Sequence, residues 1–412
     1  MDINQQEYNV AKQSGRIIHA KINILTFDFQ IVDEISGVVL DGSSYNVDAN
    51  SDIRRTCNIS LIPKDSTFDV AYGGKLWMDK YVQIFIGIED IKNNDEIIYS
   101  NLGLYLINNP DQVYDATNNT ITISGIDLMA KITGIRNGYL GFDGATEYQI
   151  TENTSIKQVM TNIIRNLCGF TRYSIDQPSP TILTPSAMSF GLGSTAYNMV
   201  SQLRDINAGY QIYFDQDGIF WFNKIPTGSN EQIRVNDDIW QKVLISYKKT
   251  TDFESVKNVI EVFGKTQDDG HTPYGKAVET NPESPFYAGT YNPTTHKYSN
   301  EIRIVLSGGE YDNIYPLAPY STSVTQFNSL AQQRANYELY LRCRLQNQIE
   351  LTCVPVYWLD VNWLIEITLP NKQSDTEPIT EQYIIKKIDT TLGVNGTQSI
   401  TLMKYYPLYP WG

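Results

Sequence analysis

Two stretches of the chain repeat the same order of short, apolar, strand-like segments, and this repetition limits the available folds more than any other feature. The first stretch reads YVQIFIGI, a polar loop, GLYLINNPDQVY, a turn and NTITISGIDL. The second reads NWLIEITLP, the polar loop 371–380, EQYIIKKIDTTL, a turn at 393–396 and TQSITLMKYY. Each predicts strand, loop, strand, turn, strand over about fifty residues. Few letters match, so a structural duplication and two unrelated β-meanders both remain open.

Alternation of apolar and polar residues predicts further strands in the first third of the chain. The segment 17–24 alternates with a period of two, and Cys57–Ile62 forms another such run. Strands are also predicted at Gly103–Asn108 and Asn119–Ile126, separated by the turn-rich stretch 109–119. These segments favour a β-rich fold.

The middle of the chain has helical periodicity instead. One unbroken apolar stripe with i, i+3, i+4, i+7 spacing runs through Ile156–Leu167, and Gly169 follows as a stop signal. A second helix is predicted at Thr195–Asn207. A hairpin is predicted next, from 210–214 and 219–222. Together these elements indicate a small α/β module of roughly 75 residues.

Strands are predicted to resume at Lys242–Tyr247 and Val256–Val262. Residues 266–299 are rich in Gly, Pro, Asn and Thr, and are interpreted as a long loop. A long helix is predicted at 322–346, followed by the strands of the second repeat.

The motif closest to a known site is Asp215-Gln216-Asp217-Gly218, which matches the opening of a calcium-binding loop. It lacks the third acidic residue and the downstream bidentate Glu. Asp-Gly between two strands is a hairpin turn signal, so the sequence favours a turn.

No set of residues forms a recognisable catalytic motif. Carboxylate pairs for acid–base chemistry are available in any acidic protein, and their separation cannot be read from sequence; here they come from Asp65, Asp69, Asp143, Glu147, Asp268 and Asp269. The histidines are isolated and offer little for a triad or a metal site; they are His19, His271 and His296. Neither a nucleophile elbow nor a phosphate-binding glycine loop is present. We therefore predict no catalytic residue, no cofactor and no metal.

Charge and cysteine usage narrow the class of protein further. The net charge of −14 argues against a broad grip on nucleic acid, but an acidic wall lets DNA slide past without sticking. Arg54-Arg55 and Lys248-Lys249 are small basic pairs, interpreted as solvated strand ends. The four cysteines are scattered, which favours buried thiols over disulfides or zinc ligands. The start of the chain has no secretory signal, and no apolar run is long enough for a membrane span.

Tyrosine is abundant, with 28 copies, and this suits either strand interiors or surfaces that meet partners. The aromatic end at 405–412 has two interpretations. It docks into a neighbouring subunit, or it folds onto its own domain.

The order of these elements resembles that of baseplate hub proteins of tailed phages and phage-like contractile injection systems. Three places carry the resemblance: GLYLINNP…NTITISGIDLMAKITG with Gly125, Asp127 and Leu128; the helices 156–167 and 195–207 with their hairpin; and LAQQRANYELYLRCRLQNQIELTCVPVYWLDVNWLIEI leading to YIIKKIDTTL…SITLMKY. Together they span most of residues 20–406.

The resemblance implies a mainly β, α+β fold with two tail-tube-like antiparallel β-barrel or sandwich domains flanking a small helical α/β insert. The expected division is an N-terminal arm at 1–15, a first barrel at 16–150, the insert at 151–230, a second barrel at 231–404, and the aromatic tail at 405–412. The second barrel would include the loop 266–299 and the helix 322–346.

The function that the resemblance implies is a homotrimeric hub in the virion baseplate, made in the host cytoplasm. Its two barrels per chain give a pseudo-sixfold ring that adapts a hexameric tail tube to a central spike. Expected partners are the tube, spike, tape measure and baseplate wedge proteins, with DNA passing through unbound and no membrane insertion. No enzyme activity is implied, and the chain stops just past the second barrel, without a hydrolase extension. The alternatives are a tail-tip protein of a non-contractile tail, or a carbohydrate-active or carbohydrate-binding β-protein.

Overall fold

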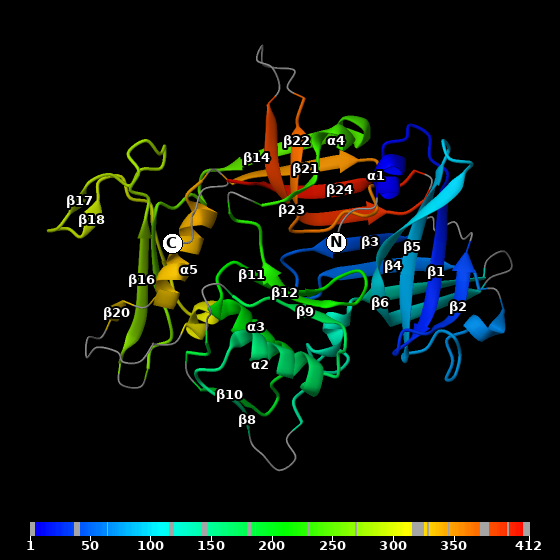
Figure 1. The fold of residues 1–412 in the computed structure, drawn as a ribbon, viewed down its shortest axis with the longest axis horizontal. Coiled ribbons are helices and arrows are strands. Elements are labelled where there is room, and N and C mark those ends of the chain that lie inside the picture. The colour runs from blue at the N-terminus through cyan, green and yellow to red at the C-terminus, as the bar shows by residue number, and fades with distance from the viewer. Residues whose placement is uncertain are drawn as a thin grey trace.

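The computed structural model describes residues 5–36, 42–63, 65–114, 119–141, 147–178, 183–185, 187–228, 231–267, 270–314, 325–327, 329–344, 346–370, 379–393 and 395–406. Within these residues the fold is built around one large sheet, to which strands from both ends of the chain contribute (Figure 1).

The N-terminal part of the sheet, called unit A, contains seven antiparallel strands that pair in the order β3-β4-β7-β6-β5-β1-β2. Their bounds are β1 Ile18–Thr26, β2 Ile31–Ser36, β3 Ser44–Asp48, β4 Arg55–Leu61, β5 Lys80–Asp90, β6 Glu96–Tyr114 and β7 Asn119–Ile126. Alternate residues of these strands are buried, as the period of two predicted. Unit A therefore forms where the sequence alternates.

The C-terminal part, called unit B, contains six strands of which five pair in the order β14-β21-β24-β23-β22. Their bounds are β13 Ile233–Val235, β14 Leu244–Asp252, β21 Gln346–Cys353, β22 Leu364–Thr368, β23 Thr380–Thr391 and β24 Gln398–Lys404. The sixth strand, β13, lies parallel to β22, and the helix α4, Asp237–Val243, follows it. The buried Trp240 of α4 packs in the core shared by both units.

The five strands of unit B that run from β14 to β24 match five strands of unit A in chain order and in pairing. β3, β4, β5, β6 and β7 correspond to β14, β21, β22, β23 and β24, and all the matching pairs are antiparallel. The repeat predicted from sequence thus appears as two antiparallel meanders, β5-β6-β7 and β22-β23-β24. The correspondence extends beyond the meanders to the strands before them.

The two units meet where β23 pairs with β3, from Lys387 opposite Asp48 to Thr391 opposite Ser44. Figure 1 shows β3 in blue beside β23 in red. The mainly β, α+β class is confirmed. The closed barrels are not: the described strands form an open sheet with β14 and β2 at its two ends, because residues 387–391 of β23 pair with β3 of unit A.

A helical insert lies between the two units in the chain. It contains the helix α2, Ile156–Asn162, which ends in a π-helical turn at Ile163–Leu167, and the helix α3, Ala196–Ile206. Its strands are β8 Glu147–Ile150, β9 Tyr173–Ile175, β10 Met188–Gly191, β11 Tyr210–Phe214 and β12 Phe220–Lys224. Both predicted helices and the predicted hairpin are confirmed.

A second, smaller sheet is inserted between β14 and β21, and one helix covers it (Figure 1). The sheet has the order β19-β15-β16-β20, and α5 packs on β15 and β16. The bounds are β15 Val259–Phe263, β16 Thr272–Val278, β19 Arg303–Leu306, β20 Thr325–Phe327 and α5 Ser329–Arg342, with a projecting two-stranded ribbon of β17 Tyr291–Asn292 and β18 Lys297–Tyr298.

The stretch 266–299 is therefore not one long loop. Its residues 272–278 alternate in burial as a strand does, and Gly275 lies so close to α5 that a Cβ there would be 2.3 Å from the Ala331 carbonyl carbon. Proline and glycine at this strand serve close packing, and they hid its alternation in the sequence.

Three further boundaries differ from the sequence prediction. The predicted helix 322–346 is shorter, because 325–327 form β20 and the helix spans Ser329–Arg342; residues 322–324 lie outside the described part. The predicted turn-rich stretch 109–119 continues as strand β6 up to Tyr114. The expected arm contains the helix α1, Gln5–Ala11, in which Val10 and Ala11 are buried.

Candidate functional site

The candidate catalytic carboxylates of the sequence lie apart in the structure. Asp65 accepts a hydrogen bond from the Thr67 backbone at the start of a short 3-10 turn, and Asp69 accepts one from Gln112. Glu147 pairs with Gln149 on the same strand. These carboxylates line neither of the two cavities described below. Asp143, Asp268 and Asp269 lie outside the described residues.

Asp215 stabilises the β11–β12 hairpin turn. Its Oδ1 accepts hydrogen bonds from the backbone of Asp217 and Ile219, each at 2.9 Å, and its Oδ2 accepts one from Trp221 Nε1 at 2.8 Å. Gly218 has a φ of 72°, which suits glycine at the end of such a turn. The predicted turn is confirmed, and its carboxylate oxygens are committed to the turn itself.

The histidines and cysteines are dispersed as well. His19 Nε2 lies 2.6 Å from Glu89 Oε1 on the surface of unit A, and His296 contacts Tyr291 in the β17–β18 ribbon. All four cysteines are free thiols, and Cys57 and Cys353 are buried. Within the described ranges, no group of three or more His, Cys, Asp or Glu side chains has the arrangement of a metal site.

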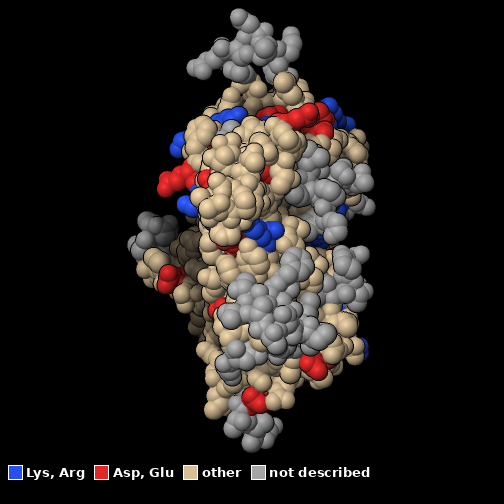
Figure 2. Space-filling model, turned by 90° about the vertical axis from the view of Figure 1, so that its left-hand side faces the viewer, with Lys and Arg blue, Asp and Glu red and all other residues tan. Residues whose placement is uncertain are grey.

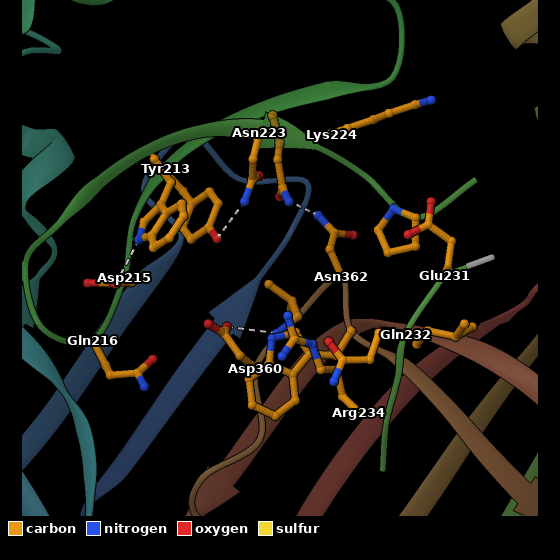
Figure 3. A pocket seen from close by; sticks show the side chains of 16 residues that line it. Tyr213, Asp215, Gln216, Asn223, Lys224, Glu231, Gln232, Arg234, Asp360 and Asn362 are labelled. Atoms are coloured by element: carbon orange, nitrogen blue, oxygen red, sulfur yellow. Dashed lines mark hydrogen bonds between the residues drawn. The ribbon is translucent and has the colours of Figure 1, made fainter. Parts of the chain in front are cut away.

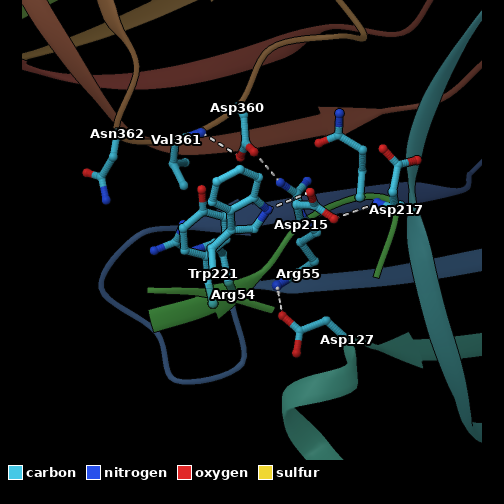
Figure 4. Close-up of polar contacts among 12 residues, drawn as sticks. Arg54, Arg55, Asp127, Asp215, Asp217, Trp221, Asp360, Val361 and Asn362 are labelled. Carbon is cyan, nitrogen blue, oxygen red and sulfur yellow. Dashed lines mark hydrogen bonds and ion pairs between the residues drawn. The ribbon is translucent and has the colours of Figure 1, made fainter. Parts of the chain in front are cut away.

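The largest concentration of buried charge lies at the start of β4, where unit A meets the insert and unit B. Arg54 and Arg55 are only 3% and 2% exposed, so their interpretation as solvated strand ends was wrong. Arg55 donates to Asp360 Oδ2 at 2.5 Å, across 305 residues of sequence (Figure 4). By contrast, Lys248 and Lys249 are exposed on β14, as predicted.

Asp127, which directly follows β7, lies on the other side of this cluster. Its Oδ2 accepts from the Arg55 backbone and its Oδ1 from the Met129 backbone, both at 2.9 Å (Figure 4). Burial raises the pKa of this carboxyl to about 6, while the two backbone donors and the nearby arginines oppose the rise. Asp127 thus fixes the turn out of unit A against β4.

Arg54 joins the insert to unit B through a chain of side-chain contacts. Its guanidinium stacks 3.9 Å from the centre of the Tyr213 ring and donates to Gln211 Oε1 at 2.7 Å. Asn362 donates to the same Gln211 oxygen at 2.7 Å, and Lys386 Nζ donates to Asn362 Oδ1 at 2.9 Å. Desolvation and the charge of nearby arginines lower the pKa of Lys386 to about 8.

Two polar cavities flank this network. One, of about 220 Å³, lies between the β11–β12 hairpin and the segments 231–234 and 360–364, as Figure 3 shows. The other, of about 460 Å³, lies between the turn 49–54, α3 and α5. In the second cavity the Tyr197 hydroxyl donates to Asp52. The arrangement suits a rigid junction, because the Arg55–Asp360 pair is buried and its geometry fixes the parts that carry it, although Nε of Arg55 and Nε and Nη1 of Arg54 have no hydrogen-bond partner among the described residues.

Sequence reasoning missed this junction. Arg55 and Asp360 are far apart in the chain, and one sequence gives no measure of their proximity. One signal was available in the sequence. A pair of arginines stands at the beginning of one alternating apolar strand, and Asp127 directly follows a second such strand. Charged residues that flank core strands are candidates for pairing across a junction.

Comparison with known proteins supports the fold. Residues 292–409 match a family described as a domain of unknown function, DUF5048, which here spans the β17–β18 ribbon, α5 and β21 to β24. No curated protein matches the sequence.

Several solved structures resemble the whole chain. The 43 kDa tail protein of prophage MuSo2 from Shewanella oneidensis has a TM-score of 0.55 and 10% identity, over 93% of this chain and 98% of that one. A tail protein from Neisseria meningitidis MC58 gives 0.56 and 8%, over 95% and 98%. Prophage tail protein gp18 from Listeria monocytogenes EGD-e gives 0.52 and 14%, over 93% and 94%. The chain has the fold of these tail proteins, so the resemblance expected from its sequence is confirmed at the level of the fold.

Proposed function

We propose that this chain, with a fold shared along almost its whole length with phage tail proteins, is a structural baseplate hub. It would assemble as a homotrimer in the virion tail, after synthesis in the host cytoplasm, and adapt a hexameric tail tube to a central spike. The proposed domains keep the expected bounds, 16–150 and 231–404 for the tube-like parts and 151–230 for the insert.

The observation that carries the proposal is the pair of matching five-strand units in one chain. Three chains supply six such units, which is the number a hexameric tube requires of a ring that continues it. Closed cyclic symmetry is the usual outcome when identical chains assemble. A trimer of this chain therefore meets a sixfold partner on one side and a threefold partner on the other.

The junction of buried charge supports the same role. A ring component must hold its two units at a fixed angle, and the Arg55–Asp360 pair and the Arg54 contacts join unit A, unit B and the insert. The net charge of −14 suits a conduit through which DNA passes without binding.

The side of the molecule that carries β16 to β18 is a candidate contact face for other baseplate components. Figure 2 shows that uncharged residues predominate in its described part, with charged residues in small separate groups. Val305 and Ile302 are about half exposed there, at 53% and 47%. Exposed apolar side chains of this kind are typical of surfaces that become covered in an assembly.

The structure also bears on catalysis and membranes. None of the helices in the described part of the chain is long and apolar enough to cross a membrane. The proposed role requires no catalysis.

The test is the mass of the purified chain by multi-angle light scattering. We expect a stable species near three times 46.8 kDa at micromolar concentration. A monomer at every concentration tested would contradict the hub. Turnover of a polysaccharide that is lost when a single Asp or Glu is changed would contradict the structural role and favour a carbohydrate-active protein.

A further inference from the structure

The junction between units A and B within one chain provides a template for a junction between chains. One edge of β23 is used twice along its length: residues 380–384 pair with β22 of the same unit, and residues 387–391 pair with β3 of unit A. A bulge between Ile385 and Lys387 separates the two segments. β23 is therefore long enough to serve its own unit and a neighbour.

β6, the counterpart of β23 in unit A, has the same construction. Its residues 96–106 pair with β5, and an irregularity between Ile107 and Pro110 follows directly. Residues 110–114 then continue along β7 on one side only, and no described strand pairs with their other edge. Val113 and Tyr114 are 53% and 81% exposed. The position that β3 fills on β23 is thus open on β6.

β14, the counterpart of β3 in unit B, is the matching open strand. It ends the large sheet and pairs with β21 alone among the described strands. Residues 245–251 are all exposed, on both faces of the strand. An exposed strand of this length at the end of a sheet is a ready template for pairing with another chain.

We infer that β14 of one protomer pairs, antiparallel, with residues 110–114 of β6 in a second copy of this chain, repeating between chains the β3–β23 junction found within one. This inference rests on the proposed trimer and specifies its interface. Three junctions within chains and three between chains then close a ring of six units, with no open β6 or β14 edge remaining.

The in-chain junction also sets the register. Thr250 of β14 is equivalent to Asn46 of β3. When the strand pairs are followed across unit B, Thr250 leads to the pair Ile384–Met403; in unit A, Asn46 leads to the matching pair Leu106–Ile126. Asn46 is opposite Asp389. The equivalent position in β6 is Asp111, because Asp389 pairs with Ser399 and Asp111 pairs with the matching residue Thr122.

This register places Lys248 opposite Val113 of the second copy, in the place of Ser44 opposite Thr391. The lysine stem would cover the exposed valine, and Tyr247 would lie opposite Tyr114. The Lys248 ammonium would lie diagonal to Asp111, at a spacing within reach of long side chains in antiparallel pairs. In this register the interface gains apolar cover and a charge pair.

The decisive experiment is a disulfide between chains. Directly opposite residues of an antiparallel pair have Cβ atoms at about 4.5–5.5 Å, close enough for a disulfide after a small adjustment. The full-length double variant Val113→Cys, Lys248→Cys is oxidised and run on a non-reducing denaturing gel. We expect dimer and trimer bands, with no larger species, and their collapse to monomer on reduction.

The matched control is Val113→Cys with Ile245→Cys, whose second cysteine lies three residues along the same strand and on its other face. At about 3.3 Å per residue it is displaced by about 10 Å, so we expect no linked species. The two single variants and the unmodified chain, with its own four cysteines, control for other disulfides.

A charge test examines the same register without cysteine. Val113→Lys places two ammonium groups opposite each other at three junctions, and we expect the concentration for half-dissociation to rise on the order of tenfold. Adding Lys248→Glu to that variant should restore the trimer. Leu192→Lys, on an exposed turn of the insert, should leave it unchanged.

The outcomes separate the inference from the proposed function. A trimer by light scattering that forms no disulfide in the 113–248 pair, or links equally well in the 113–245 pair, overturns the strand pairing and leaves the hub standing. A chain that stays monomeric overturns both. Linked trimers together with the charge rescue support both.

Discussion

Replacing Asp360 with Ala tests whether the buried ion pair holds the units together. The substitution removes the partner of the Arg55 guanidinium and the acceptor of the Val361 backbone N–H. The side chains of Arg55 and Asp360 are 3% and 8% exposed, so bulk solvent has little access to the arginine that loses its carboxylate partner. An arginine left buried without a counter-charge costs about 3–5 kcal/mol.

The loss of unfolding free energy comes from the arginine that is left buried without its partner. Removing both members of the pair should therefore destabilise the chain less. We expect the double variant Arg55→Met, Asp360→Leu to lose clearly less stability than Asp360→Ala alone, because similar apolar pairs are often neutral in place of a buried ion pair. Asp360→Asn keeps an acceptor without the charge and should fall between them. The coupling energy of the cycle then measures the pair itself.

The assay is urea unfolding followed by tryptophan fluorescence, at one fixed protein concentration because assembly adds to apparent stability. Asp79→Ala is the matched control, since the Asp79 side chain is 57% exposed in its pair with Lys80 and exposed pairs contribute about 0–1 kcal/mol. A loss below about 1 kcal/mol for Asp360→Ala would refute the reasoning. So would a double variant as unstable as the single one.

Two further predictions concern single groups. In the folded chain the Lys386 ammonium has a pKa of about 8, below its usual 10.5, so between these values the unfolded state binds more protons and stability from this group rises with pH. Lys386→Met should remove a rise of about 1–3 kcal/mol between pH 8 and 10.5, measured as the difference in urea midpoints, and an unchanged pH profile would contradict it. Thr195 caps the start of α3: its hydroxyl oxygen accepts a hydrogen bond from the Asn198 backbone N–H, and the Asn198 side-chain oxygen accepts one from the Thr195 backbone N–H. Thr195→Ala should cost about 1 kcal/mol with little effect on trimer mass, and a stability equal to the unmodified chain would count against the cap.

The sequence by itself determined which segments become strands and helices, because periodicity is a local property. The period of two in residues 17–24 gave β1, and the stripe Ile156–Leu167 gave α2 with its π turn. The repeat was also predictable from the sequence, since the order of elements is the same in both stretches although few residues are identical. The sequence prediction failed at β16, where Gly275 lies close against α5 and Pro273 interrupts the alternation.

Only the tertiary structure decided how these elements pair. Strand preference does not specify a partner, and the β3–β23 ladder joins residues more than three hundred positions apart. The burial of Arg54 and Arg55 follows from that ladder, because it brings unit B over the start of β4. The same ladder replaced two expected barrels with one open sheet whose free strands define where the next copy binds.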